Sequence, residues 1–135
     1  MKAKILLVMP PQRRDVLMNY LEEAGMEVSF ARNCREALRK LNEGLHYDLV
    51  LVDSIISGGS WREILQFVRD TRTPYEVIIC SRFGDEQLWA EMIEMGAFDL
   101  IQEPYDRLEV LRIIQAALES QYMRLFVHSV ESRIA

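Results

Sequence analysis

The sequence contains few of the residues that cross-link a chain or anchor it in a membrane. Two of its 135 residues are cysteines, Cys34 and Cys80, which lie far apart and lack the spacing of metal ligands. Cys80 ends an apolar run over residues 77–80, so we interpret it as a buried, reduced thiol. The apolar run nearest the N-terminus, residues 5–9, is too short for a signal peptide or a membrane span. We therefore expect a cytoplasmic protein that needs neither a disulfide nor a metal to hold its core.

The sequence also lacks an excess of positive charge. Its formal net charge is −5, which argues against nucleic-acid binding because that function usually needs a basic face. It has no linker rich in Gly, Ser or Pro, no low-complexity segment and no internal repeat. Half of the residues are hydrophobic and 27% are charged, which is typical of globular proteins. These properties in a chain of 135 residues predict one globular domain.

Three short apolar runs give the strongest structural signal in the chain. They cover residues 5–9, 49–52 and 77–80, and each is continuous rather than alternating. Continuous apolar strands are typical of a parallel sheet that helices cover on both faces. The middle run is followed by Asp53, which places this carboxylate at the carboxyl end of the sheet, where open α/β sheets hold their sites. Asp53 is thus the first candidate functional residue.

Strands and helices are predicted to alternate along the whole chain. Three of the five expected helices have an N-cap residue followed by an acid three positions later, at Asn33, Ser60 and Asp106. Pro11 is expected to open the first helix, and Asp85 to cap the fourth. The expected strands are residues 5–9, 26–30, 49–53, 77–81 and 97–102. This alternation predicts a parallel sheet with right-handed crossovers.

The spacing of apolar residues also predicts which side chains of the helices are buried. In the first, fourth and last helices the predicted buried faces include Val16, Leu88, Trp89, Ile93 and Leu108. Trp61 and Trp89 both have core-like spacing, and Trp89 fits an interface equally well. His46 and His128 have no partner at metal-ligand spacing and are expected to be ordinary surface histidines.

The last sixteen residues have apolar side chains beyond those that the domain needs for its own core. We expect residues 1–119 to form the domain and residues 120–135 to extend its last helix or to link it to a partner or downstream domain. Apolar residues in such an extension favour contact with a second copy or another domain. A frayed tail is the alternative.

Four features match one protein family in order and spacing. They are Asp53 at the end of the third strand, Ser81 at the end of the fourth, Gly96-Ala97 ahead of Asp99, and Glu103-Pro104-Tyr105. With them the chain resembles, over residues 2–119, the receiver domain of two-component response regulators. The resemblance implies an α/β flavodoxin-like (CheY-like), doubly wound five-stranded parallel sheet in the order 2-1-3-4-5, with helices on both faces. It also implies that Asp53 is the phosphoacceptor-equivalent residue, that Ser81 is the phosphate-contact equivalent, and that the peptide before Pro104 is cis.

The chain departs from the pattern of that family at four site positions. Met9 and Pro10 replace the two acids that hold Mg²⁺, and they offer no hard oxygen ligand from their side chains. Glu103 replaces the lysine, and Leu100 replaces the aromatic residue of the switch. Even at an effective dielectric constant of about 20, two like charges about 4 Å apart oppose each other by roughly 4 kcal/mol. We therefore expect no cofactor, with Mg²⁺ binding lost or weak, and no efficient phosphorylation.

Each candidate residue also has an ordinary structural interpretation. Asp53 has three: a strand cap that accepts hydrogen bonds from loop amides, a weak phosphoacceptor, or a contact for another ligand. Ser81 satisfies backbone groups as readily as it contacts a phosphate. Glu103 faces solvent, pairs with Arg82 or Arg13, or shares a proton with Asp53. No nucleophile or base completes a catalytic site, so we do not expect an enzyme.

The resemblance and the departures together predict a degenerate receiver, or pseudo-receiver. It would regulate signal transduction through protein–protein contacts without phosphorylation. The alternatives are weak phosphorylation at Asp53 and a small-molecule effector at the carboxyl ends of the strands. The expected partner is another protein, an output domain, or a second copy that contacts the face of the fourth helix, fifth strand and fifth helix or the C-terminal helix. Nucleic acid and membrane are not expected partners of this domain.

Overall fold

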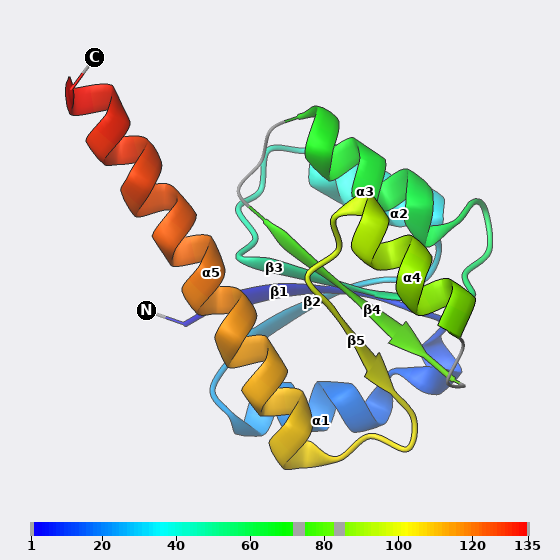
Figure 1. Ribbon diagram of the computed structural model, residues 1–135. Helices are drawn as coiled ribbons and strands as arrows, with labels where there is room; N and C mark the ends of the chain where they lie inside the picture. Colours follow the sequence, from blue (N-terminus) through cyan, green and yellow to red (C-terminus); the bar gives the residue numbers. More distant parts are fainter. Residues whose placement is uncertain (1, 72–74, 83–85, 135) are drawn as a thin grey trace.

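A computed structural model describes residues 2–71, 75–82 and 86–134 of the chain. Its sheet has five parallel strands in the order β2-β1-β3-β4-β5, as predicted from the resemblance. The strands are β1 (Lys4–Val8), β2 (Glu27–Ala31), β3 (Leu49–Asp53), β4 (Glu76–Ser81) and β5 (Asp99–Gln102). β2 and β5 form the two edges, and β3 lies at the centre (Figure 1).

Helices cover both faces of the sheet. They are η1 (Pro11–Arg13, a 3-10 turn), α1 (Asp15–Glu23), α2 (Cys34–Asn42), α3 (Trp61–Asp70), α4 (Glu86–Met95) and α5 (Arg107–Ile134). α1 and α5 cover one face, and α2, α3 and α4 cover the other (Figure 1). The five α-helices therefore alternate with the five strands, and the fold is doubly wound.

The continuous apolar runs of β1 and β3 are explained by two separate cores. Successive side chains of a strand point to opposite faces of its sheet. Leu7 and Leu51 therefore pack against α1 and α5, whereas Leu6 and Val50 pack beneath the helices of the other face. All the residues of β3 are buried, including Asp53 at its end.

The first helix begins later than predicted. Pro11 opens only the 3-10 turn η1, and α1 begins at Asp15. Pro10 has an extended backbone because the ring of the following proline disfavours a helical conformation at that position. The Arg13 N–H then closes the turn by donating to the Pro10 carbonyl at 3.0 Å. The short turn places Arg13 at the carboxyl end of the sheet.

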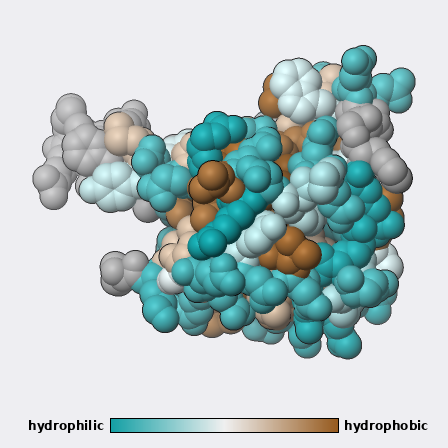
Figure 2. All heavy atoms as spheres, turned by 90° about the horizontal axis from the view of Figure 1, so that it is seen from below, coloured by the Kyte–Doolittle hydropathy of each residue, from teal (hydrophilic) through white to brown (hydrophobic). Residues whose placement is uncertain are grey.

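Four residues predicted to lie on buried helix faces are instead exposed. The exposed fractions are 47% for Val16, 53% for Trp89, 47% for Ile93 and 78% for Leu108. α4 lies near the edge of the sheet and buries Met92 fully, so the neighbouring positions on the helix turn outward. Trp61, in contrast, is 1% exposed and belongs to the core, as predicted. The side of α1 and the start of α5 is mostly hydrophilic, with small separate hydrophobic patches (Figure 2).

α5 continues without a break through residues 120–134 and extends beyond the sheet (Figure 1). Gln121 is still buried, whereas Tyr122 and Met123 are 68% and 55% exposed. Within the described ranges, no helix is both long enough and apolar enough to cross a membrane. The division of the chain at residue 119 stays a prediction, since the helix itself shows no boundary there.

Candidate functional site

The candidate site lies at the carboxyl end of the sheet, between β1, β3, β4 and β5. Asp53 ends β3 and is fully buried, and Ser81 ends the neighbouring strand β4 and is almost fully buried. β1 pairs with β2 on one side and with β3 on the other, so the chain changes direction across the sheet at this point. Such a switch point is where open α/β sheets bind ligands.

Asp53 is held by hydrogen bonds on both carboxylate oxygens. Arg13 Nε donates to Oδ2 at 2.9 Å, and the Ile55 N–H donates to Oδ1 at 3.1 Å. Arg82 Nη2 lies 3.9 Å from Oδ2 and forms a longer ion pair. A buried carboxylate is costly unless it is paired and hydrogen-bonded, and Asp53 meets both conditions within its own chain.

Glu103 is joined to the same arginine. Its backbone N–H donates to the Ser81 carbonyl at 2.9 Å, which holds the end of β5 beside β4. Its carboxylate Oε1 accepts a hydrogen bond from Arg13 Nη2 at 2.5 Å. Of the interpretations open at the sequence level, the structure shows the ion pair with Arg13. The peptide between Glu103 and Pro104 is cis, as the resemblance implies.

Arg13 therefore bridges the two carboxylates of the site. Burial lowers the pKa of its guanidinium, but the hydrogen bond with Asp53 and the charges of Asp53 and Glu103 outweigh that effect and raise the pKa above its ordinary value. Two guanidinium groups, of Arg13 and Arg82, thus face two carboxylates, and the four charges cancel. Sequence reasoning named Arg13 only as a partner of Glu103 and missed its bond to Asp53. The signal available in the sequence was a cation shortly after Met9 and Pro10, where the resemblance implies two acids.

Met9 and Pro10 do not contribute side-chain ligands to the site. Met9 is 1% exposed and packs in the core beneath α1 and α5, and its N–H donates to the Ala31 carbonyl at 3.1 Å. Pro10 is partly exposed at the start of η1. Across residues 2–71, 75–82 and 86–134, no three His, Cys, Asp or Glu side chains form a cluster that could hold a metal ion.

Leu100 is buried and Tyr105 is partly buried. Leu100 is 8% exposed and packs in the core beneath α2, α3 and α4, so no aromatic ring stands at its position. Tyr105 lies near Glu103, and burial, together with the neighbouring Cys80 and Glu103, raises the pKa of its phenol. Within the described part of the chain, no group donates to or accepts from the Tyr105 hydroxyl, although the Tyr20 hydroxyl donates to the Tyr105 carbonyl at 3.3 Å.

The two cysteines and His46 form none of the ion pairs described above. Cys80 is buried in β4, and Cys34 is buried at the start of α2, and both are free thiols whose pKa is raised by burial. His46 is exposed and pairs with Asp48 at 2.9 Å, as expected of a surface histidine. The side chain of His128 and the cap predicted at Asp85 lie outside the described residues.

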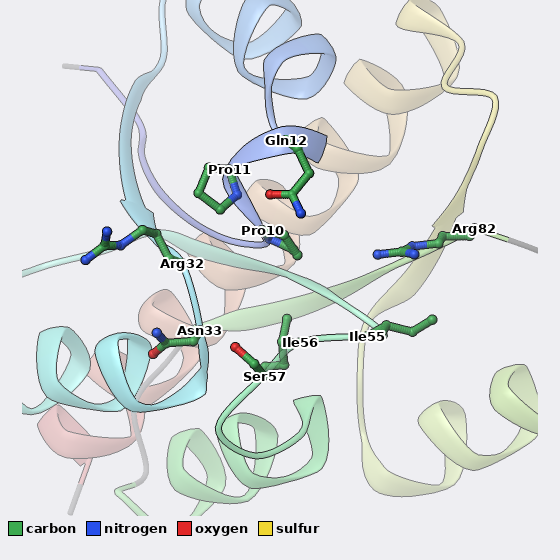
Figure 3. Close-up of a pocket in the computed structure, with 9 residues that line it drawn as sticks. All are labelled: Pro10, Pro11, Gln12, Arg32, Asn33, Ile55, Ile56, Ser57 and Arg82. Atoms are coloured by element: carbon green, nitrogen blue, oxygen red, sulfur yellow. The ribbon is translucent and has the colours of Figure 1, made fainter.

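A depression opens beside Asp53 at the same end of the sheet. It has a volume of about 550 Å³ and is lined by Pro10, Pro11, Gln12, Arg32, Asn33, Ile55, Ile56, Ser57 and Arg82 (Figure 3). A second depression of about 640 Å³ lies on the other side of Gln12 and Arg82 and reaches Glu103 and Tyr105. Among the described residues, no carboxylate lines the first depression, whereas Glu103 lines the second.

The fold agrees with comparisons to known proteins. A family model described as the response regulator receiver domain matches residues 10–115. The chain belongs to this family. Receiver domains are signalling modules, generally without enzymatic activity, that are connected to output domains or partner proteins in response regulators.

Curated relatives of this receiver domain are longer than the chain itself. Regulatory protein AtoC of Escherichia coli (strain K12) is 34% identical over 102 residues, which cover 74% of this chain and 22% of that protein. Transcriptional regulatory protein FixJ of Bradyrhizobium diazoefficiens is 27% identical over 105 residues, which cover 78% of this chain and 51% of that protein. The chain thus spans between about a fifth and a half of the length of these two relatives.

Solved structures of receiver domains share the same fold. A CheY-like receiver domain protein from Methanospirillum hungatei JF-1 superposes with a TM-score of 0.81 at 23% identity, covering 92% of this chain and 99% of that chain. NtrX from Brucella abortus, in a complex with ADP, superposes with a TM-score of 0.87 at 24% identity, covering 99% of this chain and 30% of that chain. These similarities show the flavodoxin-like fold of the receiver.

Proposed function

We propose that this receiver domain regulates its partners through protein–protein contacts and without phosphorylation. The observation that carries the proposal is the position of Arg13, which donates hydrogen bonds to Asp53 and Glu103 at once. Arg13, a cation of the chain itself, balances the charge of Asp53 in place of a metal ion. The site is neutral and hydrogen-bonded without any added group.

Phosphoryl transfer needs an accessible nucleophile and cations that neutralise the transferring oxygens. Asp53 is fully buried, and both of its oxygens already accept hydrogen bonds, from Arg13 and from the Ile55 amide. Glu103 would face the incoming phosphoryl group with a like charge. Mg²⁺ prefers octahedral oxygen coordination, and Asp53 is the one carboxylate on β1 and β3 at this end of the sheet. These features support the loss of Mg²⁺ binding and of efficient phosphorylation.

The same contacts support a fixed signalling state. Arg13 joins η1 to the ends of β3 and β5, which are 40 and 90 residues further along the chain. A conformational equilibrium shifts only when a ligand or modification binds its two states differently. We propose that these internal ion pairs select one state, and that the presence of a partner, rather than a phosphoryl group, provides the regulation.

The proposed contact surface is the face of α4, β5 and α5 together with the extension of α5. It exposes large apolar side chains that no core accommodates, namely Trp89, Ile93, Leu108, Tyr122 and Met123. Large exposed apolar side chains favour a protein interface, and tryptophan is often a major contributor to binding there. We propose a second copy or an output domain as the partner.

Incubation with Mg²⁺ and acetyl phosphate, followed by intact mass spectrometry, tests the proposal. We expect no mass increase in the parent chain. The variant Asp53→Asn is the matched control, because it lacks the acceptor oxygen and keeps the size of the side chain. A stoichiometric mass increase that is present in the parent and absent from the variant would overturn the proposal.

A second candidate function is weak phosphorylation at Asp53. The observation in its favour is the retained pair of Asp53 and Ser81 at the ends of neighbouring strands, at the place that a phosphoacceptor site needs. It predicts a partial mass increase in the same experiment that grows with Mg²⁺ concentration and disappears in Asp53→Asn.

A further inference from the structure

The depression beside Asp53 combines one inward-pointing cation with apolar walls. We infer that it binds a small organic monoanion, with one carboxylate attached to an apolar or aromatic body. The inference deepens the proposed function and rests on it. It assigns a small-molecule regulator to a site where phosphorylation is proposed to be absent. The volume of about 550 Å³ lies within the range of roughly 300–1,000 Å³ that is typical of small-molecule sites.

The cation of this depression is Arg82. Figure 3 shows its side chain extended toward the centre of the depression, whereas Arg32 extends away from it. Arg32 is paired with Glu36 at 3.2 Å on the exposed surface. Arg82 Nε is buried and, among the described residues, has no hydrogen-bond acceptor. A guanidinium can hold a carboxylate through two parallel hydrogen bonds. The carboxylate of a ligand would supply these acceptors to Arg82.

Arg82 can turn toward a ligand without leaving a buried charge unpaired. It lies 3.9 Å from Asp53 Oδ2, which is an ion pair without a close hydrogen bond. Asp53 keeps the 2.9 Å bond from Arg13 and the 3.1 Å bond from the Ile55 amide. The strong contacts of Asp53 therefore come from other groups, and Arg82 is the guanidinium left for an added anion.

The walls explain why the anion should have an apolar body. The side chains of Pro10, Pro11, Ile55 and Ile56 line the depression, and Ile55 is 56% exposed. Covering them removes apolar surface from water, which favours binding. A partly exposed ion pair alone contributes little, so a bare anion such as inorganic phosphate should bind more weakly than one with an apolar part.

Two polar groups are placed to orient the ligand. The Gln12 amide points into the depression from η1, and Ser57 lies at the opposite side, in the loop after β3 (Figure 3). Arg82 can pair with one carboxylate, and a second negative charge on the ligand would find no other inward-pointing cation among the described residues that line the depression (Figure 3). This arrangement favours a monoanion over a dianion. A bound ligand would join η1 to the loop after β3 and to the end of β4.

The test is an NMR titration of the full chain with benzoate, with benzamide and inorganic phosphate as comparison probes. We expect benzoate to shift the backbone amide signals of Gln12, Ile55, Ile56 and Ser57 and the side-chain Nε–H signal of Arg82. Benzamide and phosphate should bind at least about tenfold more weakly, since each lacks one of the two required features. Arg82→Gln should weaken benzoate binding by about tenfold or more, and Arg32→Gln by less than about twofold.

Failure of benzoate to shift these signals would overturn the inference, as would equal binding of benzamide or of phosphate. Equal binding of benzoate to Arg82→Gln and to the parent would also overturn the inference. The variant is shown to be folded if its spectrum matches that of the parent away from the substituted residue. The acetyl phosphate experiment separates the two proposals. Modification of Asp53 with benzoate binding intact would refute the proposed function alone, whereas an unmodified Asp53 without benzoate binding would refute the inference alone.

Discussion

Arg13 donates hydrogen bonds to carboxylates that lie 40 and 90 residues further along the chain, and it is mostly buried while doing so. A guanidinium suits this role because it stays charged and offers several donors in one plane, so that one group can serve two acceptors. Lysine has a single charged nitrogen on a flexible stem and cannot reproduce that geometry. At the scale of the residue, the site is therefore defined by one cation that serves two carboxylates.

Arg13→Met should destabilise the protein by about 3–5 kcal/mol, because it removes one partner of a buried ion pair and leaves Asp53 without its main cation. Methionine keeps most of the apolar stem, so the loss reports the charge. Urea unfolding at neutral pH measures it. Arg107→Met is the matched control, since Arg107 forms an exposed pair with Glu23 at 3.6 Å, and it should change the free energy of unfolding by no more than about 0.5 kcal/mol. Equal stability of the two variants would contradict the role given to Arg13.

Contacts between neighbouring elements hold the loops of this end of the molecule in place. The Cys34 N–H at the start of α2 donates to the Ser57 carbonyl at 3.0 Å, which fixes the loop after β3. Arg62 of α3 donates two hydrogen bonds to the carboxylate of Glu91 on α4. At the scale of the element, the loop after β3 is held by its contact with α2, and α3 is joined to α4 on the same face of the sheet.

Gly59→Ala should destabilise the protein more than Gly44→Ala does. Both glycines have positive φ, but a Cβ at Gly59 would lie 2.7 Å from Cys34 Sγ, whereas a Cβ at Gly44 meets no atom within 4 Å. We expect about 1–3 kcal/mol from overpacking at Gly59 in addition to the backbone strain that both variants share. Chemical denaturation of the two variants checks the difference. Equal losses would mean that the loop moves away freely from α2.

The pair between Arg62 and Glu91 predicts a pH effect with a defined sign. The hydrogen bond from Arg62 lowers the pKa of Glu91 in the folded protein below its ordinary value. Its contribution to stability is therefore present above the pKa of the unfolded chain and is lost as the pH falls through the folded pKa. NMR titration of the Glu91 side chain should show the lowered pKa in the parent and a return toward the ordinary value in Arg62→Ala. An unchanged pKa in the variant would contradict this account of the pair.

Sequence patterns predicted the sheet well because the relevant information is local. Continuous burial on two faces explains β1, β3 and β4 residue by residue, and the family motifs supplied the strand order. The exposure of Trp89 was not predictable in that way, because it depends on where α4 lies relative to the sheet edge. The bond between Arg13 and Asp53 joins segments that only the folded chain brings together. Across the whole molecule, the local sequence pattern predicts the core, whereas the tertiary structure determines which charged side chains meet in the site.

The extension of α5 should mediate association of the whole molecule. Light scattering should give a larger mass for residues 1–135 than for residues 1–121, because the shorter chain loses the exposed apolar side chains of Tyr122 and Met123 and keeps Gln121, which is buried. Circular dichroism of the shorter chain confirms that the domain remains folded. Equal monomeric masses would exclude self-association through this segment and leave an output domain or another protein as the partner.

The ion pair of Arg13 has a consequence for what this receiver can report in a cell. A cation that is part of the chain is present at the site in a fixed ratio of one to one, whatever the supply of magnesium or of phosphodonors. On the proposed function, neither energy charge nor kinase activity sets the fraction of molecules in the signalling state. The quantities that remain variable are the numbers of receiver and partner molecules and the concentration of the proposed ligand, and these would set the strength of the signal.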